Sequence, residues 1–296
     1  MSIKSIIQSF RVPFLALTPV CVFLGVSSVT ANQSDVDLFL LSLTFLGALS
    51  AHISVNTLNE YFDFQSGLDL TTTRTKFSGG SGAIPETPEI ARYVFFIGIA
   101  SLIATMIIGC FFVWKYGFAI VPIGLVGIVL IITYTDWINR QPFFCLIAPG
   151  LGFGTLMVVG TQFVLEGEYT SYSWLSSLVP FFLVNNLLLL NQYPDITADT
   201  SIGRNNFPIA YGTNKSNLVY AFFVLGTAMV IITSVFKGYF PVLSLIALLP
   251  LPLALYSLNG AIKYGKDIGN HPQYLATNVA TTIIAPILLG ISLTYK

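Results

Sequence analysis

The chain has 296 residues and no net formal charge, and only 9% of its residues are charged, whereas 54% are hydrophobic. A soluble domain of average composition carries about 25% charged residues. This composition therefore excludes an ordinary soluble protein and indicates one that lies in lipid. The sequence contains no basic block and no acidic tail, so we expect no nucleic-acid partner. No obligate protein partner is evident from the sequence.

Apolar runs recur along the whole chain. A hydrocarbon core about 30 Å thick needs about 20 apolar residues per helix. Scanning for such runs predicts nine transmembrane helices, at residues 12–29, 37–62, 90–112, 117–135, 143–165, 174–192, 217–236, 239–258 and 274–294. No long polar linker separates them, so we expect a single all-α integral membrane domain over residues 1–296.

The positions of lysine and arginine predict the orientation of this bundle, because positive residues are retained on the cytoplasmic side. The amino terminus and the loops after even-numbered helices hold most of them: Lys4, Arg11, Arg74, Lys76, Arg92, Arg140, Arg204, Lys215, Lys263 and Lys266. Only Lys115, Lys237 and Lys296 fall on the other side. We therefore expect a cytoplasmic amino terminus, with the two longest loops, 63–89 and 193–216, on the same face.

A polar cluster ends the second predicted helix and continues into the first of these loops. Asn56, Asn59 and Asp63 are spaced to share one face of a helix, and Asp69 follows in the loop. His52 lies one turn before Asn56 on the same face. A stripe of polar side chains is therefore predicted to run from the cytoplasmic end into the bundle.

A matching cluster ends the sixth predicted helix. Asn191, Asp195 and Asp199 again have helical spacing, although Pro194 can interrupt that register. Both segments repeat an Asn-x-x-x-Asp core at the same end of two even-numbered helices. We therefore expect a bundle of nine transmembrane helices with two Asp-rich cytoplasmic loops on one side of the bundle.

Two acidic clusters next to a membrane favour a bound cation. Carboxylate and amide oxygens are the ligands that Mg²⁺ accepts, and Mg²⁺ usually shares its coordination with substrate phosphates. A diphosphate also needs cationic partners, and backbone N–H groups of the Gly-Ser run 78–82 are suited to contact it. The candidate cations near the two clusters are Arg11, Arg74, Lys76, Arg140, Arg204 and Lys215.

Each of these residues also has a simpler interpretation. An Asn or Asp at a helix end commonly caps the helix, and the positive-inside rule alone explains Lys and Arg on this face. His52 fits a hydrogen-bonded position inside the bundle as well as it fits a base. The conjunction of two matched clusters with flanking cations favours the binding site.

These motifs resemble the UbiA superfamily of intramembrane prenyltransferases, whose fold has nine helices and two Asp-rich motifs after helices 2 and 6. The run from Asn59 to Asp69 is similar to the first motif, and the run from Asn191 to Asp199, followed by Arg204, is similar to the second. The resemblance covers essentially the whole chain. It implies a multi-pass protein of a bacterial or archaeal plasma membrane.

Within the superfamily, the spacing of the first motif and the pair Asn56 and Asn59 resemble the branch that acts on 1,4-dihydroxy-2-naphthoate in menaquinone biosynthesis. Three positions depart from that branch, at Pro194, at residues 204–206 and at residues 136–137. These departures leave the diphosphate chemistry unchanged. They leave the identity of the aromatic acceptor open.

The resemblance also implies roles for individual residues. Mg²⁺ would be held by Asp63, Asp69, Asp195 and Asp199, with Asn59 and Asn191 completing the sites. The diphosphate would be bound by Asn56, Asn59, Asn191, Arg11, Arg74, Lys76, Arg140 and Arg204. Departure of the diphosphate would leave an allylic cation, which the aromatic acceptor would attack. Tyr134 and Tyr61 are the candidates to stabilise that cation through their rings.

Two alternatives remain at this point. A transferase of the same superfamily that uses 4-hydroxybenzoate, homogentisate or another lipid precursor would carry the same motifs. An ion-coupled transporter also places acidic residues in helices, but its sites typically lie near the membrane midplane on broken helices. The acids of this chain cluster at helix ends, which favours the transferase.

Overall fold

The computed structural model describes residues 3–32 and 34–295, and within these ranges the protein is helical, without a strand. Its amino-terminal half contains α1 (Ile3–Ser9), α2 (Val12–Leu15), α3 (Leu17–Ala31), α4 (Leu38–Gln65), α5 (Leu68–Thr71), α6 (Ala83–Glu86), η1 (Pro88–Ile90), α7 (Ala91–Tyr116), η2 (Gly117–Ile120), α8 (Val121–Thr133) and η3 (Ile138–Arg140). The remainder contains α9 (Pro142–Pro149), η4 (Gly150–Leu156), α10 (Met157–Glu166), α11 (Ser171–Asn191), α12 (Ile196–Ser201), α13 (Phe207–Phe236), η5 (Val242–Leu248), α14 (Leu251–Tyr264), η6 (Gly265–Asn270) and α15 (Pro272–Thr294).

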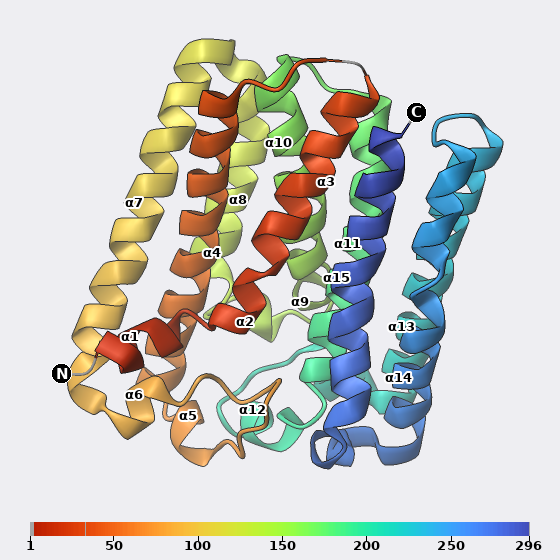
Figure 1. The fold of residues 1–296 in the computed structure, drawn as a ribbon. Coiled ribbons are helices and arrows are strands. Elements are labelled where there is room, and N and C mark those ends of the chain that lie inside the picture. Colours follow the sequence, from red (N-terminus) through yellow and green to blue (C-terminus); the bar gives the residue numbers. More distant parts are fainter. Residues whose placement is uncertain (1–2, 33, 296) are drawn as a thin grey trace.

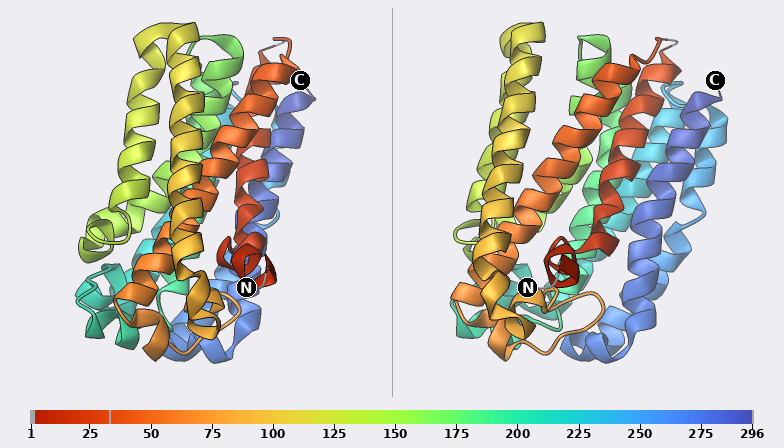
Figure 2. Two further views of the ribbon diagram at one scale, coloured as in Figure 1. Left: turned by 90° about the vertical axis from the view of Figure 1, so that its left-hand side faces the viewer. Right: turned by 60° about the vertical axis from the view of Figure 1, so that its left-hand side comes forward.

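The long helices form one bundle, and the expectation of an all-helical membrane protein is confirmed (Figure 1). Eight segments among the described residues are long and apolar enough to cross a membrane, against the nine predicted. The difference lies in Pro88–Thr133, a single apolar segment that contains the third and fourth predicted spans. Within it, α7 and α8 run in opposite directions and meet at a turn (Figure 2). Gly117 makes that turn with a φ of 69°, a conformation that other residues rarely adopt.

The short helices gather at one end of the bundle. Helices α1, α5, α6 and α12 all lie there, whereas the carboxyl-terminal end of α15 lies at the opposite end (Figure 1). Both predicted Asp-rich loops therefore occupy one face, as their sequence positions indicated. Lys296, which entered the predicted charge asymmetry, lies outside the described residues.

Helix α4 carries the first acidic cluster to this face. Asp37 begins the helix, because its Oδ1 accepts hydrogen bonds from the backbone N–H of Phe39 at 2.8 Å and of Leu40 at 3.1 Å. The helix ends at Gln65, and Gly67 then adopts a φ of 80°. This glycine turns the chain directly into α5, which holds Asp69. The end of α4 therefore falls between Asp63 and Asp69, and Asp69 lies in a separate short helix within the predicted loop.

The second cluster is also divided between two helices. Helix α11 ends at Asn191, a turn follows, and Asp195 precedes α12, which carries Asp199. The interruption falls where Pro194 predicts it. The backbone N–H of Asp199 still donates to the carbonyl of Asp195 at 2.8 Å, so the two carboxylates keep the spacing of a helical turn.

Segment η4 packs closely against α11. At Gly150, a Cβ atom would lie 2.1 Å from the carbonyl oxygen of Phe181, so only glycine fits there. The backbone N–H of Gly150 donates to Oδ1 of Asn185 at 2.6 Å. Because η4 follows a π-helical path, which is typical of functional sites, this stretch departs from a regular α-helix where the two segments touch.

Candidate active site

A cavity of about 770 Å³ runs through the bundle from the face that holds the short helices. Its wall includes Thr44 near the beginning of α4 and Asp63 near the end of that helix. At 1.5 Å of rise per residue, these two positions are about 28 Å apart along the helix. The cavity therefore extends along most of the length of α4.

The two ends of this cavity differ in chemistry. All four predicted acidic residues line one end, together with Arg11 and Arg204. The wall farther from them is mainly apolar and comes from α7, α8, η4 and α10, including Phe112, Ile123, Leu156 and Val164. The cavity thus joins a charged chamber to an apolar channel, an arrangement suited to a ligand with an anionic head and a hydrocarbon tail.

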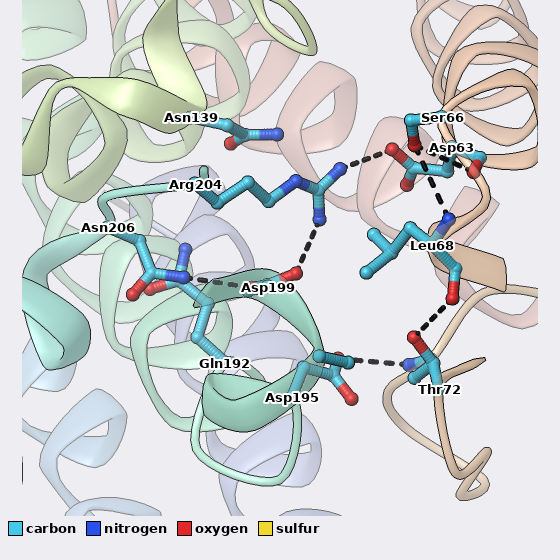
Figure 3. A network of polar contacts seen from close by, with 12 residues as sticks. Asp63, Ser66, Leu68, Thr72, Asn139, Gln192, Asp195, Asp199, Arg204 and Asn206 are labelled. Carbon is cyan, nitrogen blue, oxygen red and sulfur yellow. Dashed lines mark hydrogen bonds and ion pairs between the residues drawn. The ribbon is translucent and has the colours of Figure 1, made fainter. Parts of the chain in front are cut away.

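Arg204 lies between the two acidic clusters (Figure 3). One terminal amino group of its guanidinium donates to Oδ1 of Asp63, and the other donates to Oδ1 of Asp199 at 2.9 Å. The backbone N–H of Arg204 also donates to the carbonyl of Asp199 at 3.0 Å. Despite desolvation, the charges of Asp63 and Asp199 raise the pKa of Arg204 above its usual value, so this cation remains charged between them.

Asn206 supports the same arrangement from the start of α13. Its Oδ1 accepts from the backbone N–H of Ile209 at 3.2 Å and caps the helix. Its Nδ2 donates to Oδ2 of Asp199 at 3.0 Å. The cap of α13 therefore also orients the Asp199 carboxylate, a role that the sequence does not distinguish from simple capping.

The loop between α5 and α6 contacts the second cluster. The backbone N–H of Gly79 donates to Oδ2 of Asp195 at 3.0 Å. Gly79 has a φ of 81° and Gly80 a φ of 73°, which explains why glycines occupy this stretch. The Gly-Ser run 78–82 is thus part of the charged chamber, and residues 78–81 line its wall.

Several buried oxygen atoms in the chamber have no hydrogen-bond partner among the residues that the structure describes. They are Oδ2 of Asp69, Oδ1 of Asn191 and Oδ1 of Asp195. Leaving such acceptors unpaired in a buried site is costly, and hard oxygen atoms of this type are ligands for Mg²⁺. The donor set therefore fits a divalent cation.

The carboxylates do not converge into a complete metal cage. Within residues 3–32 and 34–295, no three Asp, Glu, His or Cys side chains lie close enough to hold an ion by themselves. Mg²⁺ usually keeps several waters and binds proteins through one or two carboxylates plus substrate phosphates. An incomplete protein shell of this kind suits an ion that is shared with a phosphate ligand.

Burial changes the acidity of the two carboxylates that have unpartnered atoms. Desolvation, together with the charges of Asp63 and Glu60, raises the pKa of Asp69 to about 7. Desolvation and the charge of Asp199 raise the pKa of Asp195 to about 7. Both carboxylates therefore exchange protons near neutral pH, and a bound cation would favour their ionised forms.

The predicted site residues other than the carboxylates and the cations all line the cavity, and several of them are held by hydrogen bonds. Asn59 and Asn191 line the charged chamber, and Nδ2 of Asn59 donates to the hydroxyl of Thr135 at 3.2 Å. Asn56 also lines it, but its Nδ2 donates to the carbonyl of Phe10 at 2.9 Å. Tyr134 lies in the cavity wall at the end of α8. His52 also lines the cavity, and its Nδ1 shares a hydrogen bond of 2.8 Å with Thr18.

The structure brings only some of the predicted cations to the cavity. Arg11, Lys76 and Arg204 line it. Arg74 instead forms an ion pair of 3.0 Å with the exposed Glu86, and neither Arg74 nor Arg140 is part of the cavity wall described here. Arg140 is exposed.

Sequence reasoning missed several polar residues that shape the chamber. Glu60 is fully buried and pairs with Arg11. Asn139 and Gln192 line the cavity near Arg204 (Figure 3). The backbone N–H of Asn205 donates to the carbonyl of Asn139 at 3.0 Å, which joins two loops that are distant in sequence. Glu60 lies within the first motif and Gln192 within the second, and this position was the available signal for both, whereas nothing in the sequence singled out Asn139.

The helical bundle and its cavity define an intramembrane protein in which a cluster of carboxylates opens into an apolar channel. A sequence profile described as the UbiA prenyltransferase family matches residues 18–267. The chain therefore belongs to the UbiA prenyltransferase family, and the resemblance noted from the two motifs is confirmed.

The individual relatives share limited sequence identity with this chain. The chain is 28% identical over 180 residues to "1,4-dihydroxy-2-naphthoate octaprenyltransferase" of Bacillus subtilis (strain 168), and the match covers 60% of this chain and 56% of that protein. Its fold is similar to a UbiA homolog from Aeropyrum pernix K1, with a TM-score of 0.71, 15% identity and coverage of 95% and 96% of the two chains. A UbiA homolog from Archaeoglobus fulgidus, bound to DMAPP and Mg²⁺, gives a TM-score of 0.68 at 16% identity over 98% and 99%.

Proposed function

We propose that this protein transfers a polyprenyl group from its diphosphate to an aromatic quinone precursor inside the membrane. The observation that carries the proposal is a cavity with four carboxylates and two arginines at one end and a mainly apolar wall along the rest. A prenyl diphosphate has matching parts, an anionic head and a hydrocarbon tail. Membership of the UbiA prenyltransferase family supports the same reaction.

The charged chamber is suited to hold Mg²⁺ with the diphosphate. Asp63, Asp69, Asp195 and Asp199 are the proposed ligands, and Asn59 and Asn191 complete or orient the sites. The A. fulgidus homolog, which has a similar fold, is bound to DMAPP and Mg²⁺. When bound, Mg²⁺ would supply positive charge that stabilises the leaving diphosphate.

The protein's own residues have distinct proposed roles. Arg204 and Arg11 bind diphosphate oxygens, and Arg204 keeps the two clusters in register through Asp63 and Asp199. Asn56 and Lys76 lie at the same end of the cavity and are further candidates for diphosphate contacts. The apolar wall excludes water that would react with an allylic cation. Tyr134 lines the cavity, and its ring is our candidate for stabilising the cation.

The proposed acceptor is 1,4-dihydroxy-2-naphthoate, which would place the reaction in menaquinone biosynthesis. The B. subtilis relative carries that substrate in its name, and its identity of 28% over part of each chain supports the assignment. An acceptor such as 4-hydroxybenzoate or homogentisate is the alternative. We also propose that α7 and α8 each cross the plasma membrane, giving nine crossings with the amino terminus in the cytoplasm.

The function is tested with purified protein, geranylgeranyl diphosphate and one acceptor at a time, in Mg²⁺ or in EDTA. We expect a prenylated product with 1,4-dihydroxy-2-naphthoate in Mg²⁺ and none in EDTA. A product with 4-hydroxybenzoate or homogentisate instead would replace the acceptor and keep the reaction. Diphosphate that stays intact with every acceptor would refute the proposed reaction.

The acidity of the chamber predicts how Mg²⁺ binding depends on pH. Metal ligation requires ionised carboxylates, and the pKa values of Asp69 and Asp195 are about 7. Raising the pH from 6 to 8 should therefore increase the affinity for Mg²⁺ by about tenfold for each of these carboxylates that binds the ion. Titration calorimetry in detergent measures this change. The double variant Asp69→Asn/Asp195→Asn should lose most of this dependence of Mg²⁺ affinity on pH. An unchanged pH dependence in the double variant would contradict the prediction.

The apolar channel predicts a limit on the length of the prenyl tail. Gly124 on α8 lines the cavity, and a Cβ atom there would meet open space. Gly124→Phe should therefore fill the channel and shift donor preference from long to short prenyl diphosphates by tenfold or more. Val126→Phe is the matched control, because Val126 lies on the same helix, is 38% exposed and lies outside the described cavity wall. Equal chain-length profiles in both variants would contradict this path for the tail.

A further inference from the structure

Glu60 differs from the other acidic residues of the first motif in its surroundings. Asp63 and Asp69 line the cavity, whereas Glu60 is fully buried and lies outside the cavity wall. A buried carboxylate is tolerated only when it is paired and hydrogen-bonded. Its partners therefore indicate what it does.

The first partner of Glu60 is the Gly-Ser loop. Its Oε1 accepts from the backbone N–H of Ser81 at 2.8 Å, and its Oε2 accepts from the hydroxyl of the same serine at 2.5 Å. Two residues earlier in this loop, Gly79 donates its N–H to Asp195. The loop is thus fixed at one point to α4 and at another to the second acidic cluster.

The second partner is Arg11. Its Nε donates to Oε1 of Glu60 at 2.6 Å, which leaves the two terminal amino groups of the guanidinium for the cavity that Arg11 lines. The backbone of Arg11 has a φ of 53°, an unfavourable value for a residue other than glycine, which surrounding contacts must stabilise. The pairing with Glu60 is one such contact.

Two further hydrogen bonds hold the same three segments together. Nε2 of Gln8 donates to the carbonyl of Ser81 at 2.7 Å, and Nδ2 of Asn56 donates to the carbonyl of Phe10 at 2.9 Å. The amino-terminal segment, α4 and the Gly-Ser loop therefore meet around Glu60. Each of them contributes a wall to the charged chamber.

We propose that Glu60 is a positioning residue for the diphosphate and not a metal ligand. It orients the guanidinium of Arg11 and fixes the Gly-Ser loop against the wall of the chamber through Ser81. This role rests on the proposed function, because it assigns the diphosphate as the ligand of the residues that Glu60 orients. A carboxylate is needed at this position, since it accepts from Arg11 and from both donors of Ser81 at once.

The test compares Glu60→Gln with the wild-type protein in three measurements. Glutamine keeps the size of the side chain but replaces one acceptor by an NH₂ donor. We expect binding of inorganic pyrophosphate in Mg²⁺ to weaken about tenfold, which corresponds to the loss of one good hydrogen bond to a charged group. Hydrogen exchange of the segment 77–82 should become faster. The affinity for Mg²⁺ alone should stay within about twofold of the wild type.

Two further variants separate positioning from a general structural effect. Arg11→Met alone should weaken pyrophosphate binding. In the double variant Arg11→Met/Glu60→Gln, the fold loss of affinity should be smaller than the product of the losses in the two single variants. Glu89→Gln is the matched control, because Glu89 is an exposed carboxylate and has no ion pair within the described ranges. It should change none of the three measurements.

The outcomes distinguish this proposal from the proposed function. A large loss of Mg²⁺ affinity in Glu60→Gln, with unchanged hydrogen exchange, would overturn positioning and make Glu60 a metal ligand. If Glu60→Gln does not fold, Ser81→Ala removes one donor from the same contact and should still speed exchange of residues 77–82. In a third outcome, Glu60→Gln speeds hydrogen exchange but the wild-type protein binds no pyrophosphate. That result would confirm the contact between Glu60 and the Gly-Ser loop. It would refute diphosphate binding as the purpose of the contact and count against the proposed reaction.

Discussion

Replacement of Asp63 by alanine is expected to lower prenyl transfer by about a thousandfold or more while the protein stays folded. Asp63 lies at the end of α4 in the charged chamber, where it pairs with Arg204. Its removal eliminates a proposed Mg²⁺ ligand and the charge that orients Arg204. Losing one preorganised electrostatic contact commonly costs about a hundredfold to a thousandfold in rate, and this substitution removes two.

The measurement is the rate of product formation at saturating Mg²⁺, with the thermal unfolding temperature in detergent as the check on folding. Asp195→Ala should behave similarly, because Asp195 contributes from the opposite cluster. Asp136→Ala is the control, since Asp136 is exposed and lies outside the described wall of the cavity. Wild-type rates in both Asp63→Ala and Asp195→Ala would refute the assignment of the chamber as the diphosphate site.

Replacement of Arg204 by alanine is expected to destabilise the metal-free protein, and added Mg²⁺ should reverse much of that loss. The side chains of Arg204, Asp63 and Asp199 are 13%, 6% and 4% exposed, so solvent screens their pairing only slightly. Breaking a buried ion pair by removing one partner costs about 3 to 5 kcal/mol. A divalent cation between the two carboxylates would replace the missing charge and stabilise the folded state by mass action.

Thermal unfolding with and without Mg²⁺ measures this effect, and the same variant should bind pyrophosphate about tenfold more weakly through loss of a charged hydrogen-bond donor. Arg140→Ala is the matched control, because Arg140 lies on the same face but is exposed and outside the described cavity wall. A loss of stability in Arg204→Ala that Mg²⁺ does not change would mean that its carboxylate partners do not bind the ion.

The helices were largely predictable because lipid imposes a simple rule on the sequence. The predicted span 37–62 corresponds to α4 and the span 274–294 to α15, each within a few residues. The count differed at Pro88–Thr133, where α7 and α8 are joined by a short apolar turn. The sequence prediction divides this segment at residues 113–116, and the positive φ of Gly117 marks the boundary between the two helices in the structure.

The acidic residues of the site were predictable for a different reason, since carboxylates at membrane helices are costly and recur there for function. Their partners were not. The contact of Gly79 with Asp195 joins residues 116 positions apart, and no local pattern specifies such a pairing. The same limit applies to Glu60, whose pairing with Arg11 also joins residues that are distant in sequence, and to Arg140, which lies outside the described cavity wall.

The ion pair between Arg204 and Asp63 has a consequence for the order in which the protein is made. The two residues are 141 positions apart, so α4 is synthesised long before its cationic partner exists. Asp63 lies two residues from the end of α4, where an unpaired carboxylate costs less than at the membrane centre. A nascent chain can therefore integrate its first helices with this charge uncompensated. The acidic end of the bundle reaches its final arrangement only after the ribosome has passed Arg204.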